Sequence, residues 1–144
     1  MAVFKDVEQL YECIGELMAR GQVHETVGPK IGKSKQIIRF KYTNPDSQIT
    51  IDATGSPNKP GTHFDLILGD CDLKPDIMLS STADVAHRFW HGKINLIKAL
   101  TKREVSLKGS KTKVIRLLPA ITPMFKVYPI VLKDKGYNHL IIKK

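Results

Sequence analysis

The chain has 144 residues, 42% of them hydrophobic and 26% charged, which is close to the averages of globular proteins. A chain of this length can bury enough surface to form a core without metal ions or disulfides, so we expect a single domain over residues 1–144. It has two cysteines, no cationic and apolar leader at its start, and no apolar run long enough to span a membrane. These features predict a cytoplasmic protein with reduced thiols.

The net charge of +9 is unevenly distributed along the chain. Residues 1–72 carry 8 basic and 10 acidic side chains, whereas residues 73–144 carry 15 basic and 4 acidic side chains. The second half is therefore strongly cationic. Such an asymmetry favours an anionic partner, which could be nucleic acid, a negatively charged membrane surface or the head group of an acidic ligand.

Apolar residues three and four positions apart predict an amphipathic helix over residues 6–20, with Asp6 as its N-cap and Gly21 as its left-handed end. The apolar stripe consists of Val7, Leu10, Tyr11, Ile14, Leu17 and Met18. Cys13 falls on the more polar side of this helix and is expected to be unreactive. Glycine and proline residues then predict a turn-rich connection over residues 22–35 instead of another long helix.

Alternation of apolar and polar residues predicts strands in the next part of the chain. Residues 38–42 and 49–53 flank a turn at Asn44 and are typical of a β-hairpin. Residues 63–68 and 76–80 predict a third and a fourth strand. Each strand has one apolar and one polar face, as in an antiparallel sheet that helices cover on one side only.

Two helices are predicted after the fourth strand. Thr82 or Ser81 can cap the first, and its apolar stripe ends at Gly92. Residues 94–100 predict a second, shorter helix, and residues 105–107 predict a fifth strand. Together these elements indicate an α+β fold with a five-stranded, mostly antiparallel sheet covered on one face by helices.

Prolines punctuate the C-terminal quarter of the chain. A helix over residues 114–118 is expected to stop at Pro119, since proline lacks the backbone N–H that continues a helix. Thr122 is a candidate cap for a last helix, which has Pro123 in its first turn. Pro129 is expected to break or kink that helix.

The sequence lacks the common motifs of catalysis, among them the Gly-x-Ser-x-Gly elbow and the phosphate-binding glycine loop. His87 and His91 lie four residues apart on a predicted helix and could share a metal ion, but no third ligand is suggested. We interpret them as histidines on the helix surface. Asp70 and Asp72 should raise the pKa of the Cys71 thiol between them, which argues against a nucleophile. The sequence therefore predicts no enzyme, no metal and no cofactor.

The motifs of residues 76–118 follow one another in a characteristic order: Asp-Ile-Met-Leu-Ser at 76–80, Gly-Lys-Ile-Asn at 92–95 and Val-Ser-Leu-Lys-Gly at 105–109, before a leucine-containing segment. This order, over about a third of the chain, resembles the sterol carrier protein type 2 family of small lipid-binding domains. Arg103-Glu104 stands where members of that family often carry Gly-Lys. The bend into the fifth strand should therefore be less sharp than usual.

The resemblance implies a non-enzymatic carrier that holds a long-chain lipid between the apolar face of the sheet and the helices. A fatty acid, an acyl-coenzyme A, a sterol or a phospholipid would each fit this description. The candidate lining residues are Phe40, Ile51, Phe64, Leu66, Phe89, Trp90, Leu96, Leu100, Leu107, Leu117, Met124 and Phe125. Met124 and Phe125 are candidates for a movable lid, because methionine adapts to ligands of different shape. From periodicity alone, the same stripes would serve a filled core equally well.

A basic group in the second half is expected to contact an anionic head group or membrane surface. Its members are Lys102, Arg103, Lys108, Lys111, Lys113 and Arg116. One alternative is a solvated face that confers solubility, and another is a basic nucleic-acid-binding module. No aromatic residue lies between Trp90 and Phe125 to stack on bases, so nucleic acid is the weaker hypothesis. A third alternative is an accessory domain that presents lipid to an enzyme. The oligomeric state is left open.

Overall fold

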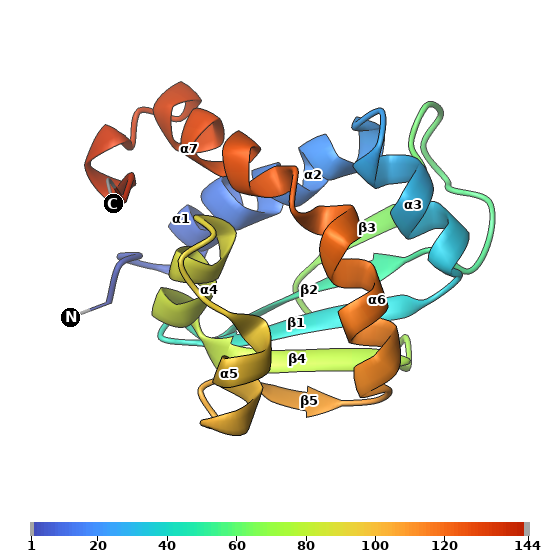
Figure 1. Ribbon diagram of the computed structural model, residues 1–144. Coiled ribbons are helices and arrows are strands. Elements are labelled where there is room, and N and C mark those ends of the chain that lie inside the picture. Colours follow the sequence, from blue (N-terminus) through green and yellow to red (C-terminus); the bar gives the residue numbers. More distant parts are fainter. Residues whose placement is uncertain (1, 143–144) are drawn as a thin grey trace.

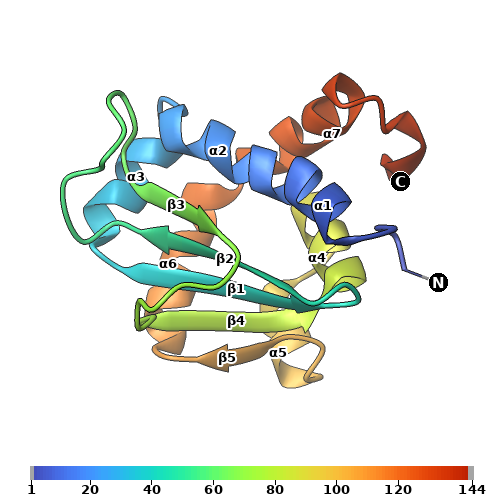
Figure 2. The same ribbon diagram turned by 180° about the vertical axis from the view of Figure 1, so that it is seen from behind.

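The computed structural model of the protein describes residues 2–142 and contains one five-stranded sheet. The strands are β1 (Ile37–Thr43), β2 (Ser47–Asp52), β3 (Asp65–Leu68), β4 (Ile77–Thr82) and β5 (Ser106–Lys108). Their order across the sheet is β3-β2-β1-β4-β5, and only the central pair β1–β4 is parallel. The helices lie over one face of this sheet (Figures 1 and 2), so the predicted fold class is confirmed.

The helices are α1 (Val7–Leu10), α2 (Glu16–Val23), α3 (Val27–Ser34), α4 (Ala83–Trp90), α5 (Leu96–Thr101), α6 (Lys111–Ile121) and α7 (Met124–Asp134). A π-helical turn, Tyr11–Gly15, joins α1 to α2, and a 3-10 turn, Asn138–Leu140, follows α7. The predicted caps of two helices are confirmed: Asp6 accepts a hydrogen bond from the backbone N–H of Gln9 at 2.8 Å, and Thr82 accepts one from that of Val85 at 3.2 Å.

The strand register turns the apolar residues toward the helices. Directly opposite residues of neighbouring strands share a face, and Phe40 of β1 is opposite both Ile49 of β2 and Leu79 of β4. The inner face therefore collects Ile38, Phe40, Tyr42, Ile49, Ile51, Leu66, Ile77, Leu79, Ser81 and Leu107. The residues between them, such as Arg39 and Lys41, point to the outer face.

Two predictions for the N-terminal third are wrong. Gly21 does not end the first helix, which continues to Val23. Residues 22–35 are not a turn-rich connection, because more than half of them form α3. Gly28 and Gly32 are needed there for close packing: a Cβ atom would lie 2.5 Å from the His63 ring at Gly28 and 2.7 Å from the His63 carbonyl oxygen at Gly32. These glycines allow α3 to approach the loop at His63 closely, and they do not form a turn.

The prolines near the C-terminus interrupt the helices less than predicted. Pro119 lies inside α6, which continues for two residues to Ile121. A proline this close to the end of a helix removes only one backbone hydrogen bond, so the last residues remain helical. Thr122 does not cap α7, because its hydroxyl donates back to the carbonyl of Pro119 at 3.0 Å. Pro129 lies within α7 and does not break it.

The bend between α6 and α7 also bears on membrane insertion. Within residues 2–142 no single helix has the length and apolar composition needed to cross a bilayer. Helices α6 and α7 have the required length and composition only when they are counted together, and a bend of 62° separates them.

Candidate functional site: an apolar cavity between sheet and helices

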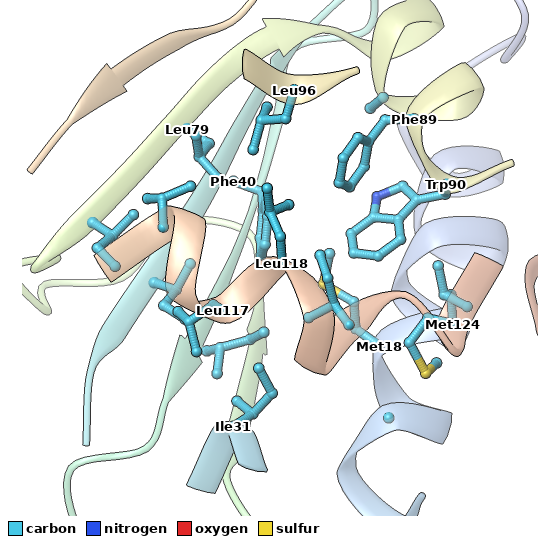
Figure 3. A pocket seen from close by; sticks show the side chains of 18 of the residues that line it. Met18, Ile31, Phe40, Leu79, Phe89, Trp90, Leu96, Leu117, Leu118 and Met124 are labelled. Carbon is cyan, nitrogen blue, oxygen red and sulfur yellow. The ribbon is translucent and has the colours of Figure 1, made fainter. Parts of the chain in front are cut away.

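An apolar cavity of about 100 Å³ lies between the inner face of the sheet and the helices (Figure 3). Strands β1, β2 and β4 form its floor, and α2, α3, α4, α6 and α7 contribute to its walls and roof. The lining, all from the described residues 2–142, contains no charged side chain. Its polar groups belong to Tyr42, Trp90 and Ser81, and the Ser81 hydroxyl donates to the carbonyl of Thr82 at 2.9 Å. The cavity can therefore accept apolar groups but offers no countercharge.

Eight of the twelve candidate residues line this cavity: Phe40, Ile51, Phe64, Phe89, Trp90, Leu96, Leu117 and Met124. The other four lie beside it. Leu66 and Leu107 belong to the edge strands β3 and β5, beyond the cavity floor. Leu100 lies on α5, and Phe125 packs edge-to-face against Phe89 with ring centroids 5.4 Å apart. That any of the twelve candidates contacts a ligand stays a prediction.

Several lining residues were not among the candidates. Val27 and Ile31 of α3 are four residues apart, and this spacing was the available signal, but the neighbouring glycines favoured a turn. Leu17 and Met18 belong to the recognised apolar stripe of the first helix, and only the fold shows that they face the cavity. The distribution of lining residues along the chain could not be derived from periodicity alone.

The exposure of the lining residues shows where the cavity opens. All the residues contributed by α2, α3 and β2 are buried. The half-buried lining residues are Phe40, Leu79, Ser81, Phe89, Leu117, Leu118 and Ile121. They come from β1, β4, α4 and α6. The cavity is thus closed toward α2 and α3, and the half-buried residues indicate an entrance between α4, β4 and α6. Leu96 of α5 lies beside Leu79 and Phe89 on this side of the cavity (Figure 3).

His87 of α4 is not on the helix surface, so the prediction is wrong for this residue, and His91, the C-cap residue of α4, is half-buried. His87 is 2% exposed; its Nε2 lies 2.8 Å from the carbonyl oxygen of Leu140, and its Nδ1 lies 2.8 Å from the Tyr128 hydroxyl. A carbonyl can only accept, so Nε2 carries the proton and Nδ1 accepts from Tyr128. Burial lowers the pKa of His87 to about 4. Nε2 of His91 accepts from the backbone N–H of Ile142 at 3.1 Å.

These histidines therefore attach the C-terminal segment to α4 and hold it in its packed position. Among residues 2–142 no group of three histidine, cysteine or carboxylate side chains is arranged to bind a metal ion.

The cysteines also differ from expectation. Cys13 is fully buried instead of lying on a polar side, and burial raises its pKa to about 12. For Cys71, burial alone would raise the pKa, but hydrogen bonds with Thr50, the backbone of Leu73 and the Arg39 guanidinium, 3.2 Å from the sulfur, lower it overall. The prediction from the flanking aspartates is wrong, because the arginine contacts the thiol directly. This thiol lies at the outer face of the sheet, away from the cavity.

All six basic candidates are exposed, and none lines the cavity: Lys102, Arg103, Lys108, Lys111, Lys113 and Arg116. Two of them follow α5, one ends β5, and three lie on the first half of α6. Within residues 2–142 none of them forms an ion pair. Their charges are therefore available to a partner outside the domain.

Together, these features define a class: a small α+β domain whose helices enclose an apolar space against one face of a mixed sheet. Solved structures of this class share the fold. Sterol Carrier Protein 2 from Yarrowia lipolytica, in its apo form, is 18% identical, with a TM-score of 0.58 over 80% of this chain and 88% of that chain. The sterol carrier protein domain 2 of Helicoverpa armigera is 17% identical, with a TM-score of 0.58 over 80% and 89%.

A third structure is palmitated SCP2L2 from Aedes aegypti, which is 16% identical, with a TM-score of 0.53 over 77% of this chain and 92% of that chain. No family model matches the sequence, and no curated protein sequence does. The resemblance seen in residues 76–118 is thereby confirmed at the level of the fold: the chain has the fold of sterol carrier protein 2 domains.

Proposed function

We propose that this protein is a non-enzymatic lipid carrier that holds the acyl chain of a long-chain lipid in the apolar cavity. The main observation in favour is the cavity itself, which opens to one side and has no charged side chain in its lining. The fold adds support, because a domain with the same fold, SCP2L2 of Aedes aegypti, has been solved in a palmitated form. Acyl chains are the natural ligands of a space with these walls.

The transfer of methylene groups from water supplies the binding free energy. Each buried methylene contributes about 0.8 kcal/mol, so a chain of about fifteen gains roughly 12 kcal/mol before the association cost of at least ~4 kcal/mol. The remainder corresponds to a dissociation constant near the micromolar range. Apolar walls distinguish chains that differ by one methylene only weakly, so we expect broad specificity.

A whole chain requires the cavity to widen. An apolar cavity of about 150 Å³ holds a molecule the size of benzene, and the cavity here measures about 100 Å³. Met18 of α2 and Met124 of α7 both line this space (Figure 3). Their unbranched side chains can change rotamer to make room for a longer chain. Binding of the full chain is thus coupled to rearrangement of the roof.

The absence of charge in the lining also fixes the orientation of the ligand. A carboxylate moved into the apolar interior would lose its hydration without gaining a partner. The acyl chain therefore enters first, and the head group stays at the entrance between α4, β4 and α6. Ser81 suits the boundary between chain and head group, because its side chain is polar, lines the cavity and is half-buried.

Titration of delipidated protein with a fluorescent fatty acid tests this function. Trp90 is the only tryptophan and lines the cavity, so energy transfer from it reports occupancy of this space. We expect saturable transfer that persists at high salt, since burial of methylenes does not depend on ionic strength. If no saturable signal arose at any salt concentration, the space would be a packing defect and the carrier function would be refuted.

A further inference from the structure

Two exposed isoleucines lie on the helices that flank the cavity entrance. Ile97 of α5 is 45% exposed and directly follows Leu96, which lines the cavity. Ile115 of α6 is 39% exposed and directly follows the lining residue Val114. Both helices belong to the layer over the inner face of the sheet (Figure 1). Each helix thus has one side toward the cavity and an outward side with a large apolar residue.

The charge around these isoleucines is almost entirely positive. Residues 88–126, which run from α4 into α7, contain ten lysines and arginines and a single acidic residue, Glu104. On α5 and α6 the exposed cations are Lys98, Lys111, Lys113 and Arg116. Within the described residues none of them is paired with a carboxylate. The outward side of the two helices therefore combines unneutralised cations with exposed apolar side chains.

We propose that the outward side of α5 and α6 is a docking face for an anionic lipid bilayer. The docking face consists of Ile97, Ile115, Lys98, Lys111, Lys113 and Arg116. The cations bind lipid phosphates, and the two isoleucines insert at the boundary of head groups and acyl chains. A bilayer offers both kinds of contact to one surface. Nucleic acid fits less well, since residues 91–124 contain no phenylalanine, tyrosine or tryptophan on which bases could stack.

Docking in this way brings the cavity entrance to the membrane. The entrance lies between α4, β4 and α6, and the docking face adjoins it on α5 and α6. This consequence rests on the proposed carrier function: an acyl chain would pass from the bilayer to the cavity without crossing water, and its anionic head group would remain near the cations. Docking itself requires only the face and the bilayer.

Sedimentation with phospholipid vesicles tests the docking face. The wild-type protein should partition onto vesicles that contain phosphatidylglycerol and not onto vesicles of phosphatidylcholine alone. Replacing Lys111, Lys113 and Arg116 together by Gln should lower this partition coefficient about a hundredfold, given the contribution of each cation near an anionic surface. The matched control replaces Lys41, Lys59 and Lys74 by Gln, which removes the same charge from positions outside these helices. It should retain most of the binding.

The apolar contribution is tested by Ile115→Ser, which should lower partition about tenfold through lost burial of the side chain. Val23→Ser is its control, because Val23 is 60% exposed at the end of α2. All these variants should have the circular dichroism spectrum and the melting temperature of the wild type, which shows that they are folded. An equal loss of vesicle binding in both triple variants would overturn the docking face and would leave the net charge of the protein as the cause of binding.

Two further results separate docking from carriage. If the wild type bound fatty acid but no vesicle, the docking face would be refuted and the carrier function would stand. If the wild type bound vesicles through these residues but no fatty acid, docking would be supported and carriage refuted. Binding of a single-stranded oligonucleotide by the same cations, without vesicle binding, would replace the bilayer by nucleic acid as the partner.

Discussion

A larger side chain at Ala86 would separate a cavity from a tightly packed core. Ala86 lies on α4, is 4% exposed and lines the cavity. Removing the corresponding atoms from a packed core, as in Leu→Ala, costs about 2–5 kcal/mol. Ala86→Leu adds these atoms where empty space already exists and should recover part of this free energy. We expect about 1–2 kcal/mol of stabilisation. For a chain of this length this corresponds to a rise in Tm of about 3–6 °C.

The same substitution should reduce fatty acid binding at least tenfold, since three added carbon atoms occupy space that the acyl chain needs. Calorimetry measures the change in Tm, and energy transfer from Trp90 measures binding. Ala83→Leu is the matched control: Ala83 is fully buried on the same helix but does not line the cavity. It should overpack and destabilise the protein by about 1–3 kcal/mol. Destabilisation of Ala86→Leu to the same extent, with unchanged binding, would refute the cavity.

Three other predictions follow from particular contacts. Gly32→Ala should destabilise the protein by about 1–3 kcal/mol in urea unfolding, because its Cβ would lie 2.7 Å from the carbonyl oxygen of His63. Stability should be greatest above pH 6.5 and fall by about 3 kcal/mol toward pH 4, because burial lowers the pKa of His87 from 6.5 to about 4 and the unfolded state binds the proton first. Iodoacetamide should modify Cys71 and spare the buried Cys13, as peptide mass spectrometry would show.

Each of these predictions has a control in the chain. Gly21→Ala places its Cβ 3.7 Å from Met124 and should not destabilise, so a loss equal to that of the Gly32 variant would contradict the steric explanation. His87→Gln removes this titratable group and should weaken the pH dependence between 4 and 6.5, while the lowered pKa of the partly buried His91 retains some of it. Arg39→Gln should slow the modification of Cys71. An unchanged rate would exclude the guanidinium as the cause of its lowered pKa.

The sequence predicts those parts of the fold that depend on neighbouring residues. The hairpin of β1 and β2 follows from alternation on both sides of a turn, and the caps Asp6 and Thr82 follow from side chains that bond to their own helices. The failures have a different physical origin. In the sequence Gly28 and Gly32 predict turns, although the fold requires them for the approach of His63, about thirty residues away in the chain. Local patterns cannot distinguish the two uses of glycine.

The candidate site could likewise be predicted only in part from the sequence. Apolar stripes identify which residues face inward, and eight of the twelve candidates line the cavity. They do not show which inward residues surround empty space, because this depends on how far the helices lie from the sheet. The role of His87 depends on Tyr128 and Leu140, which are 41 and 53 residues away. Such a network has no signature in the sequence around the histidine.

The cavity links the stability of the protein to its ligand. A void of about 100 Å³ lowers stability by about 2 kcal/mol relative to a filled core, at about 24 cal/mol per Å³. A lipid that fills it restores these contacts, and at a hundred times its dissociation constant it adds about 2.7 kcal/mol. The Tm of the wild type should then rise by about 9 °C with saturating fatty acid, since the entropy of unfolding is about 2.1 cal/mol/K per residue.

The Ala86→Leu variant already fills part of the void and should show little of this rise, although its Tm without ligand is higher. Calorimetry of both proteins with and without fatty acid therefore gives four values that a single cavity must explain. An equal rise in both proteins would place the lipid elsewhere on the molecule. A rise in the wild type alone ties lipid binding to the space between α4 and the sheet.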